Sequence, residues 1–207
     1  MSVLNLPHRF LPPGDPAEGL TILALHGTGG DENALLELAV TMHPGASVLA
    51  PRGSVNEAGA ARWFRRHAEG VFDEEDIRLQ VPRLAEFVAE ACRAYDRNPA
   101  RVVAIGYSNG ANMAAATMLL APETLRGALM YRAMLPLTPD PLPDLAGRDA
   151  LIVSGSHDPM GPLPSAEALG RLLSESRATV RHEILPGGHG LVTPDVDLGR
   201  LWLRGLD

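Results

Sequence analysis

The sequence predicts an α/β fold in which a mostly parallel sheet lies between two layers of helices. Six short runs are apolar almost throughout, which is typical of strands that are buried on both faces. Helix-like segments separate these runs, and strands that alternate with helices favour a parallel sheet. A chain of 207 residues suits one domain, residues 1–207, that buries its own core.

The expected strands are residues 20–27, 47–53, 101–108, 127–133, 149–156 and 179–185. Two irregular stretches, 51–72 and 134–148, are rich in Gly and Arg or in Pro, and we expect both to be surface loops. In open parallel sheets the functional site lies beyond the carboxyl ends of the strands. The residues that directly follow each strand are therefore the candidates for chemistry.

The expected helices are residues 32–43, 73–96, 109–121, 164–177 and 194–205. Asp31 is suited to cap the N-terminus of the first of them. Acidic residues open the second helix, where they favour the positive end of the helix dipole. Pro82 is expected to kink that helix or to divide it into two.

Composition excludes several classes of function. The net charge of −7 argues against a nucleic-acid partner, because such proteins gather a basic surface. The absence of lysine excludes a Schiff-base lysine, a Ser–Lys dyad and a phosphate-binding P-loop. The single cysteine, Cys92, is expected to be a small buried residue. Since no signal peptide and no run of about 18 apolar residues is found, we expect a cytoplasmic protein without a membrane span.

The pattern GYSNG, residues 106–110, joins an expected strand directly to an expected helix. This is the context of a nucleophile elbow, a strained turn that exposes a serine, here Ser108. Glycine at positions 106 and 110 removes side chains that would collide with the neighbouring backbone. The alternative is an ordinary glycine-rich turn.

A nucleophilic serine needs a base, and the elbow predicts an acid and then a histidine further along the chain. Asp158 follows the strand 149–156, and His189 follows the strand 179–185, so both lie at the same sheet edge as Ser108. Competing residues are less well placed: His182 within a strand, Asp149 at a strand start, and Asp140 and Asp144 in the Pro-rich loop. The favoured set is Ser108, Asp158 and His189.

The glycine-rich stretch HGTGGDE, residues 26–32, follows the first expected strand. Such a loop can present backbone N–H groups to an anion, but it lacks the spacing and the lysine of a phosphate site. In an acyl-transfer enzyme it suits an oxyanion hole. The expected donors are the N–H groups of Thr28 and of Asn109, the residue after the nucleophile.

The stretch RWFRR, residues 62–66, follows the second expected strand at the same edge. Trp63 and Phe64 could line an acyl or aromatic pocket, and Arg65 or Arg66 could meet a carboxylate. The alternative is a surface loop with its aromatic residues folded beneath it.

The motifs LALHGTGGDE, LAPRG, RWFRR, IGYSNGAN, GSHDPM and LPGGHGL together resemble the phospholipase/carboxylesterase family of α/β-hydrolases, which includes the acyl-protein thioesterases. The wording is most similar to small bacterial carboxylesterases associated with hydroquinone resistance. The resemblance runs from about residue 20 to the end of the chain. It implies an α/β-hydrolase fold, a triad on Ser108, Asp158 and His189, oxyanion donors at Thr28 and Asn109, and often a homodimer.

The expected function is that of a serine hydrolase acting on small carboxylic esters, with no metal or organic cofactor. The chain is too short for a large lid, which favours small soluble substrates. A lactone or dienelactone hydrolase and an acyl-thioesterase are alternatives, although dienelactone hydrolases usually carry cysteine where this chain has Ser108. A catalytically silent fold that binds a ligand or protein is a third, and it would be expected to have lost a triad residue.

Overall fold

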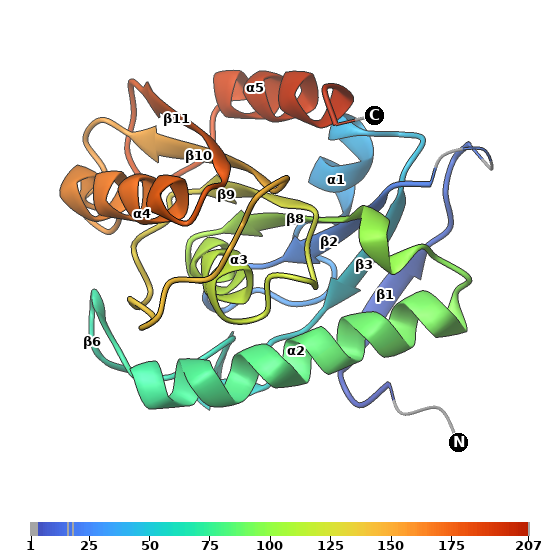
Figure 1. Cartoon of the computed structure of the whole chain (residues 1–207), viewed down its shortest axis with the longest axis horizontal. Helices are drawn as coiled ribbons and strands as arrows, with labels where there is room; N and C mark the ends of the chain where they lie inside the picture. The colour runs from blue at the N-terminus through green and yellow to red at the C-terminus, as the bar shows by residue number, and fades with distance from the viewer. Residues whose placement is uncertain (1–3, 16, 18, 207) are drawn as a thin grey trace.

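A computed structural model describes residues 4–15, 17 and 19–206. Its main feature is a seven-stranded sheet with the order β1-β3-β2-β8-β9-β10-β11 (Figure 1). The strands of this sheet are β1 (His8–Leu11), β2 (Thr21–Leu25), β3 (Ser47–Pro51), β8 (Val102–Tyr107), β9 (Gly127–Tyr131), β10 (Asp149–Gly155) and β11 (Thr179–Leu185). Every pairing is parallel except that of β1 with β3.

Helices cover both faces of the sheet, which confirms the predicted fold class. They are α1 (Leu36–Met42), α2 (Glu74–Ala94), α3 (Asn109–Leu120), α4 (Leu163–Glu175) and α5 (Thr193–Arg204), with a 3-10 turn at Pro99–Arg101. Helices α2, α3 and α4 pack their apolar residues against one face of the sheet, and α1 and α5 pack against the other (Figure 1). Each face thus has its own apolar core.

Burial of the central strands explains why the sequence shows them as apolar runs. All five residues of β2, β3 and β9 are buried, because helices cover both sides. Strand β11 lies at the sheet edge, and there exposed positions alternate with partly buried ones. This strand therefore carries charged residues that the central strands lack.

Three local expectations about these elements are corrected. Asp31 caps no helix, because α1 begins later, at Leu36; its Oδ1 instead accepts from Asn33 N at 2.8 Å within a turn. Pro82 lies inside one helix, α2, so it does not divide that helix into two, and the alternative expectation of a kink stays a prediction. The 51–72 stretch is not an irregular loop throughout.

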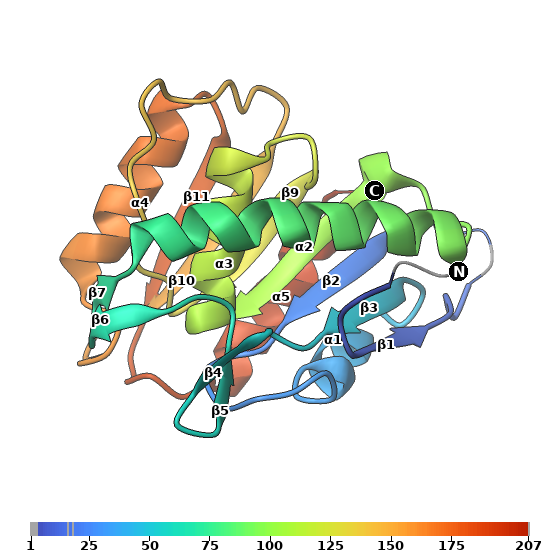
Figure 2. The ribbon, with the colours of Figure 1, turned by 90° about the horizontal axis from the view of Figure 1, so that it is seen from below.

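Two hairpins form in that stretch. They are β4 (Val55–Glu57) with β5 (Ala60–Arg62), and β6 (Arg66–Ala68) with β7 (Val71–Phe72), as Figure 2 shows. Residues 134–148, all of which the structure describes, contain no helix or strand, as expected. The two hairpins are additional to the seven-stranded sheet and follow the carboxyl end of strand β3.

Candidate active site

Ser108 lies on the turn between the buried strand β8 and helix α3. Its φ of 54° and ψ of −118° place it in a region that side chains rarely adopt, a strain that commonly marks a functional residue. A Cβ on Gly106 would lie 2.5 Å from the oxygen of Gly110, and a Cβ on Gly110 would lie 2.5 Å from the oxygen of His26. The collisions expected from the sequence are therefore real, and only glycine fits on either side of the serine.

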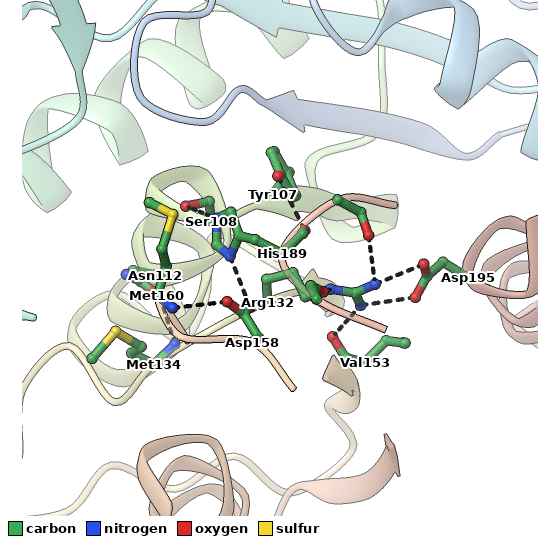
Figure 3. Close-up of polar contacts among 12 residues, drawn as sticks. Tyr107, Ser108, Asn112, Arg132, Met134, Val153, Asp158, Met160, His189 and Asp195 are labelled. Carbon is green, nitrogen blue, oxygen red and sulfur yellow. Dashed lines mark hydrogen bonds and ion pairs between the residues drawn. The ribbon is translucent and has the colours of Figure 1, made fainter. Parts of the chain in front are cut away.

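The structure brings Ser108, His189 and Asp158 together in one chain of hydrogen bonds (Figure 3). The distance from Ser108 Oγ to His189 Nε2 is 2.9 Å, and that from His189 Nδ1 to Asp158 Oδ2 is 2.7 Å. The other carboxylate oxygen of Asp158 accepts from the N–H of Met160 at 2.9 Å. In this arrangement the imidazole can take the serine proton while the carboxylate holds the ring.

Two further Ser–His pairs occur among the described residues, Ser154 with His182 at 2.9 Å and Ser156 with His157 at 2.8 Å. Burial lowers the pKa of His182, which favours its neutral form. In the described part of the chain, His189 is the histidine that contacts both a serine hydroxyl and a carboxylate. The carboxylate of Asp158 therefore distinguishes the Ser108 pair from the other two.

Thr28 and Asn109 line the same pocket as Ser108. Thr28 lies on the loop after strand β2, and Asn109 is the first residue of helix α3, directly after the serine. Within the residues that the structure describes, no protein acceptor takes the backbone N–H of either residue. Side-chain contacts hold both residues: Thr28 Oγ1 accepts from Arg62 Nη1 at 2.7 Å, and Asn109 Oδ1 accepts from Trp63 N at 2.9 Å. Both backbone donors are thus free to bind an anion.

His26 fixes the glycine-rich loop and is a residue that sequence reasoning missed. Its Nε2 accepts from Gly53 N at 2.9 Å, and its Nδ1 donates to Gly27 O at 2.7 Å. Burial lowers the pKa of His26, so the ring is held in the neutral form that can accept from Gly53. The signal available in the sequence was a histidine at the end of an apolar run, directly before the loop.

A pocket of about 190 Å³ opens beside Ser108. Its lining residues are Thr28, Arg62, Arg66, Glu69, Phe72, Tyr107, Ser108, Asn109, Asn112, Arg132, Met134, Met160 and His189. Residues of the two hairpins and of the loops after β9 and β10 form its walls. The apolar contribution comes mainly from one phenylalanine and two methionines.

The structure does not bring Trp63, Phe64 and Arg65 to this pocket, which corrects the expectation for the RWFRR stretch. Trp63 and Phe64 are buried in the core, and Trp63 Nε1 donates to His26 O at 2.8 Å. The exposed Arg65 pairs with Asp73 at 3.1 Å. The backbone turns these residues inward or outward because the stretch joins two hairpins, and that geometry is not visible in the sequence.

The first and last arginines of the same stretch do line the pocket. Arg62 is almost fully buried, and burial lowers its pKa, with the nearby charge of Arg66 acting in the same direction. Arg66 pairs with Glu57 at 3.0 Å and also with Glu69. Charges of both signs therefore meet at one wall of the pocket.

A parallel sheet with a serine on the turn after a central strand, and an acid and a histidine after later strands, defines the α/β-hydrolase class. The model of the phospholipase/carboxylesterase family matches residues 8–196. The chain belongs to that family, and it is a hydrolase of the carboxylesterase type.

Its relatives include the Bacillus subtilis protein named "Putative hydrolase MhqD", which is 40% identical over 88% of this chain and 92% of the relative. The crystal structure of a Bacillus cereus carboxylesterase is 38% identical, with a TM-score of 0.95, over 100% of this chain and 97% of the other. A carboxylesterase from Mesorhizobium loti is 35% identical, with a TM-score of 0.91, over 99% and 97%. The likeness thus extends over nearly the whole chain.

Among the described residues, a membrane-spanning helix and a cluster of metal ligands are both absent. None of the helices in that part is long and apolar enough to cross a lipid bilayer. In the same residues, no group of three or more His, Cys, Asp or Glu side chains could hold a metal ion.

Proposed function

We propose that this protein is a serine hydrolase that cleaves small carboxylic esters through Ser108, His189 and Asp158. The observation that carries the proposal is the unbroken series of hydrogen bonds from the serine hydroxyl through the imidazole to a buried carboxylate. The same serine faces a pocket, and its main chain is strained. These are the features by which a catalytic triad is recognised on unrelated folds.

In the first half-reaction, Ser108 Oγ attacks the acyl carbon while its proton passes to His189 Nε2. A bond forms between the serine oxygen and the acyl carbon, and the carbonyl oxygen becomes an oxyanion. His189 then gives the proton to the departing alcohol as the ester C–O bond breaks. Asp158 keeps the proton of His189 on Nδ1 and stabilises the imidazolium. Water repeats these steps on the acyl-enzyme and releases the acid.

The N–H groups of Thr28 and Asn109 are proposed to bind the oxyanion. Donors in such a position are worth about 3 kcal/mol each in other enzymes, because they stabilise charge that develops only in the transition state. Arg62 binds the side chain of Thr28, and the backbone N–H of Trp63 binds the side chain of Asn109. These contacts keep the N–H groups of Thr28 and Asn109 in a fixed direction.

The pocket favours short acyl groups and small soluble esters. Its volume of about 190 Å³ is below the range of about 300–1,000 Å³ usual for drug-sized ligands. Phe72, Met134 and Met160 offer apolar contacts for the acyl or alcohol part, and Arg62 and Arg66 offer charged ones. These residues replace Trp63, Phe64 and Arg65 as the proposed substrate-binding set.

The test is to incubate the protein with p-nitrophenyl acetate and with a serine-directed fluorophosphonate probe. We expect ester hydrolysis and labelling in the wild type, and neither with Ser108→Ala. Ser156→Ala is the matched control, because it removes another serine that is hydrogen-bonded to a histidine, and it is expected to keep both signals. Labelling that survives Ser108→Ala would refute the mechanism.

The same assay separates the alternative substrates. Rates on a linear ester, a thioester and an enol-lactone of similar size are compared with one enzyme preparation, and we expect the linear ester to be cleaved fastest. A homodimer and a cytoplasmic location stay predictions, and light scattering after size-exclusion chromatography tests the first. A protein that binds esters without turning them over would instead support a silent fold.

A further inference from the structure

The loop that carries His189 is held by hydrogen bonds to three consecutive carbonyl groups. Arg132 donates through Nε to Gly188 O at 3.0 Å and through Nη2 to Gly190 O at 3.0 Å. The hydroxyl of Tyr107 donates to the oxygen of His189 itself at 3.1 Å. The guanidinium of Arg132 thus binds the carbonyl groups of the residues before and after His189 (Figure 3).

Side-chain packing contributes little to the position of this loop. Gly187, Gly188 and Gly190 surround His189, and a Cβ built on Gly187 or Gly190 meets no atom within 4 Å. Glycine also has the largest backbone freedom to lose on ordering. The main-chain hydrogen bonds therefore fix the backbone that carries the imidazole, while Asp158 and Tyr107 contact the ring itself.

Arg132 is itself fixed by a buried ion pair with Asp195, a residue of helix α5. Nη1 and Nη2 donate to the two carboxylate oxygens at 2.8 Å each, and both side chains are fully buried. The same carboxylate accepts from Val192 N at 2.7 Å, and the hydroxyl of Tyr131 donates to Asp195 O at 2.8 Å. A two-pronged pair of this kind sets the plane of the guanidinium as well as its place.

Two observations argue against a role in stability alone. A buried ion pair is often no more stabilising than apolar residues of similar volume, because both charges lose their hydration. Arg132 also has a φ of 58°, a strained conformation for a residue with a side chain. Arg132 directly follows strand β9 and lines the pocket. A glycine at this position would relieve the backbone strain, yet the chain carries arginine there.

We propose that Arg132, oriented by Asp195, is a positioning residue for the reaction assigned above, and that it sets the distance between His189 Nε2 and Ser108 Oγ. This inference rests on the proposed function. Arg132 has no contact with either reacting atom, so it acts through the main chain at Gly188 and Gly190. A displacement of about 1 Å in a catalytic group can cost on the order of 100-fold in rate. The loss falls on kcat, because the imidazole acts in the chemical step and does not bind the substrate.

The first test is Arg132→Lys. Lysine keeps a positive charge opposite Asp195, but its single nitrogen cannot bind the carboxylate and both loop carbonyls as the guanidinium does. We expect kcat for p-nitrophenyl acetate to fall by roughly 10- to 100-fold, with KM within about threefold of the wild type. The rate of fluorophosphonate labelling at Ser108 should fall by a similar factor, since it also needs the base in place.

The second variant, Arg132→Met with Asp195→Asn, removes both charges together and leaves an acceptor for Val192 N. We expect a folded protein with the same loss of kcat. Ser47→Ala is the control, because it removes a buried hydrogen bond of 2.9 Å to Thr21 at the opposite end of the strands. This variant should have a lower Tm but an unchanged kcat when the assay is run well below that Tm. Circular dichroism and Tm are measured for every variant.

Folded variants at position 132 whose kcat lies within twofold of the wild type would overturn the inference. A full recovery with lysine would also overturn it, since charge alone would then be enough. A double variant that cannot fold would show a structural role in place of a positioning one. These outcomes leave the proposed function intact, which instead fails if wild-type Ser108 is not labelled.

Discussion

Replacement of Asp158 by asparagine should reverse the hydrogen bond that orients His189. Asp158 Oδ1 accepts from Met160 N at 2.9 Å, and Oδ2 accepts from His189 Nδ1 at 2.7 Å. An asparagine keeps its oxygen toward Met160 N, because that N–H is a donor and cannot form a hydrogen bond with the amide NH₂. Its NH₂ group then faces the imidazole and needs Nδ1 as an acceptor. The ring proton moves to Nε2, where it points at Ser108 Oγ and prevents the ring from acting as base.

The expected cost is about four orders of magnitude in kcat, the loss that the wrong histidine tautomer causes in a serine protease. This corresponds to about 5.4 kcal/mol of transition-state stabilisation, at about 1.36 kcal/mol per factor of ten. The side-chain volume is unchanged, so Tm should move little. Steady-state hydrolysis of p-nitrophenyl acetate measures the effect.

Asp144→Asn is the matched control. Asp144 belongs to the Pro-rich loop, is exposed and pairs with Arg177 at 2.7 Å, and with Asp140 it was an alternative acid that the sequence allowed. We expect its loss to leave kcat unchanged. If Asp158→Asn retains more than a tenth of wild-type kcat, or if Asp144→Asn loses as much activity, the assignment of the acid is wrong.

Three further predictions follow from contacts around the nucleophile. Gly110→Ala places a Cβ 2.5 Å from His26 O and should lower the free energy of unfolding by more than about 4 kcal/mol in urea titrations, whereas Gly190→Ala, with open space around its Cβ, should change it little. Thr28→Val removes the acceptor of Arg62 and should destabilise by about 1.5–3 kcal/mol, whereas Thr28→Ser should not; equal stabilities would contradict the contact. Because burial lowers the pKa of His26, the unfolded chain takes up a proton on it first, and stability should fall as pH drops below about 6.5. His26→Gln should show a smaller loss of Tm between about pH 7.5 and about pH 5.5, and parallel curves for both proteins would count against this role.

The fold and the Ser108 turn could be predicted because the signals are local. Buried strands read as apolar runs, and an elbow needs glycine at positions 106 and 110 whatever the rest of the chain does. The positions of Asp158 and His189 followed from topology, since the carboxyl ends of parallel strands share one edge. Their separation from Ser108 in the sequence therefore did not hide them.

Other features depend on contacts that the sequence does not record. Strand β1 is four residues long, three of them partly buried and Arg9 exposed, and it exists because β3 offers it an edge. Trp63 and Phe64 look like pocket residues by composition, yet the hairpins on either side turn them into the core. Arg132 had a visible signal, a single charge near the end of an apolar run, but its partner Asp195 lies far along the chain.

The two hairpins at the strand ends carry most of the proposed substrate contacts on a stretch that lies apart in sequence from the serine, acid and histidine. Arg62, Arg66, Glu69 and Phe72 all reach the pocket from this one stretch, whereas the serine, acid and histidine follow strands β8, β10 and β11 of the sheet. Its tips turn at Gly59 and Gly70, and at Gly59 open space surrounds the backbone. An engineer could exchange those tips for longer ones, as antibody loops are exchanged on a constant framework, while leaving the anchored residues between the hairpins in place.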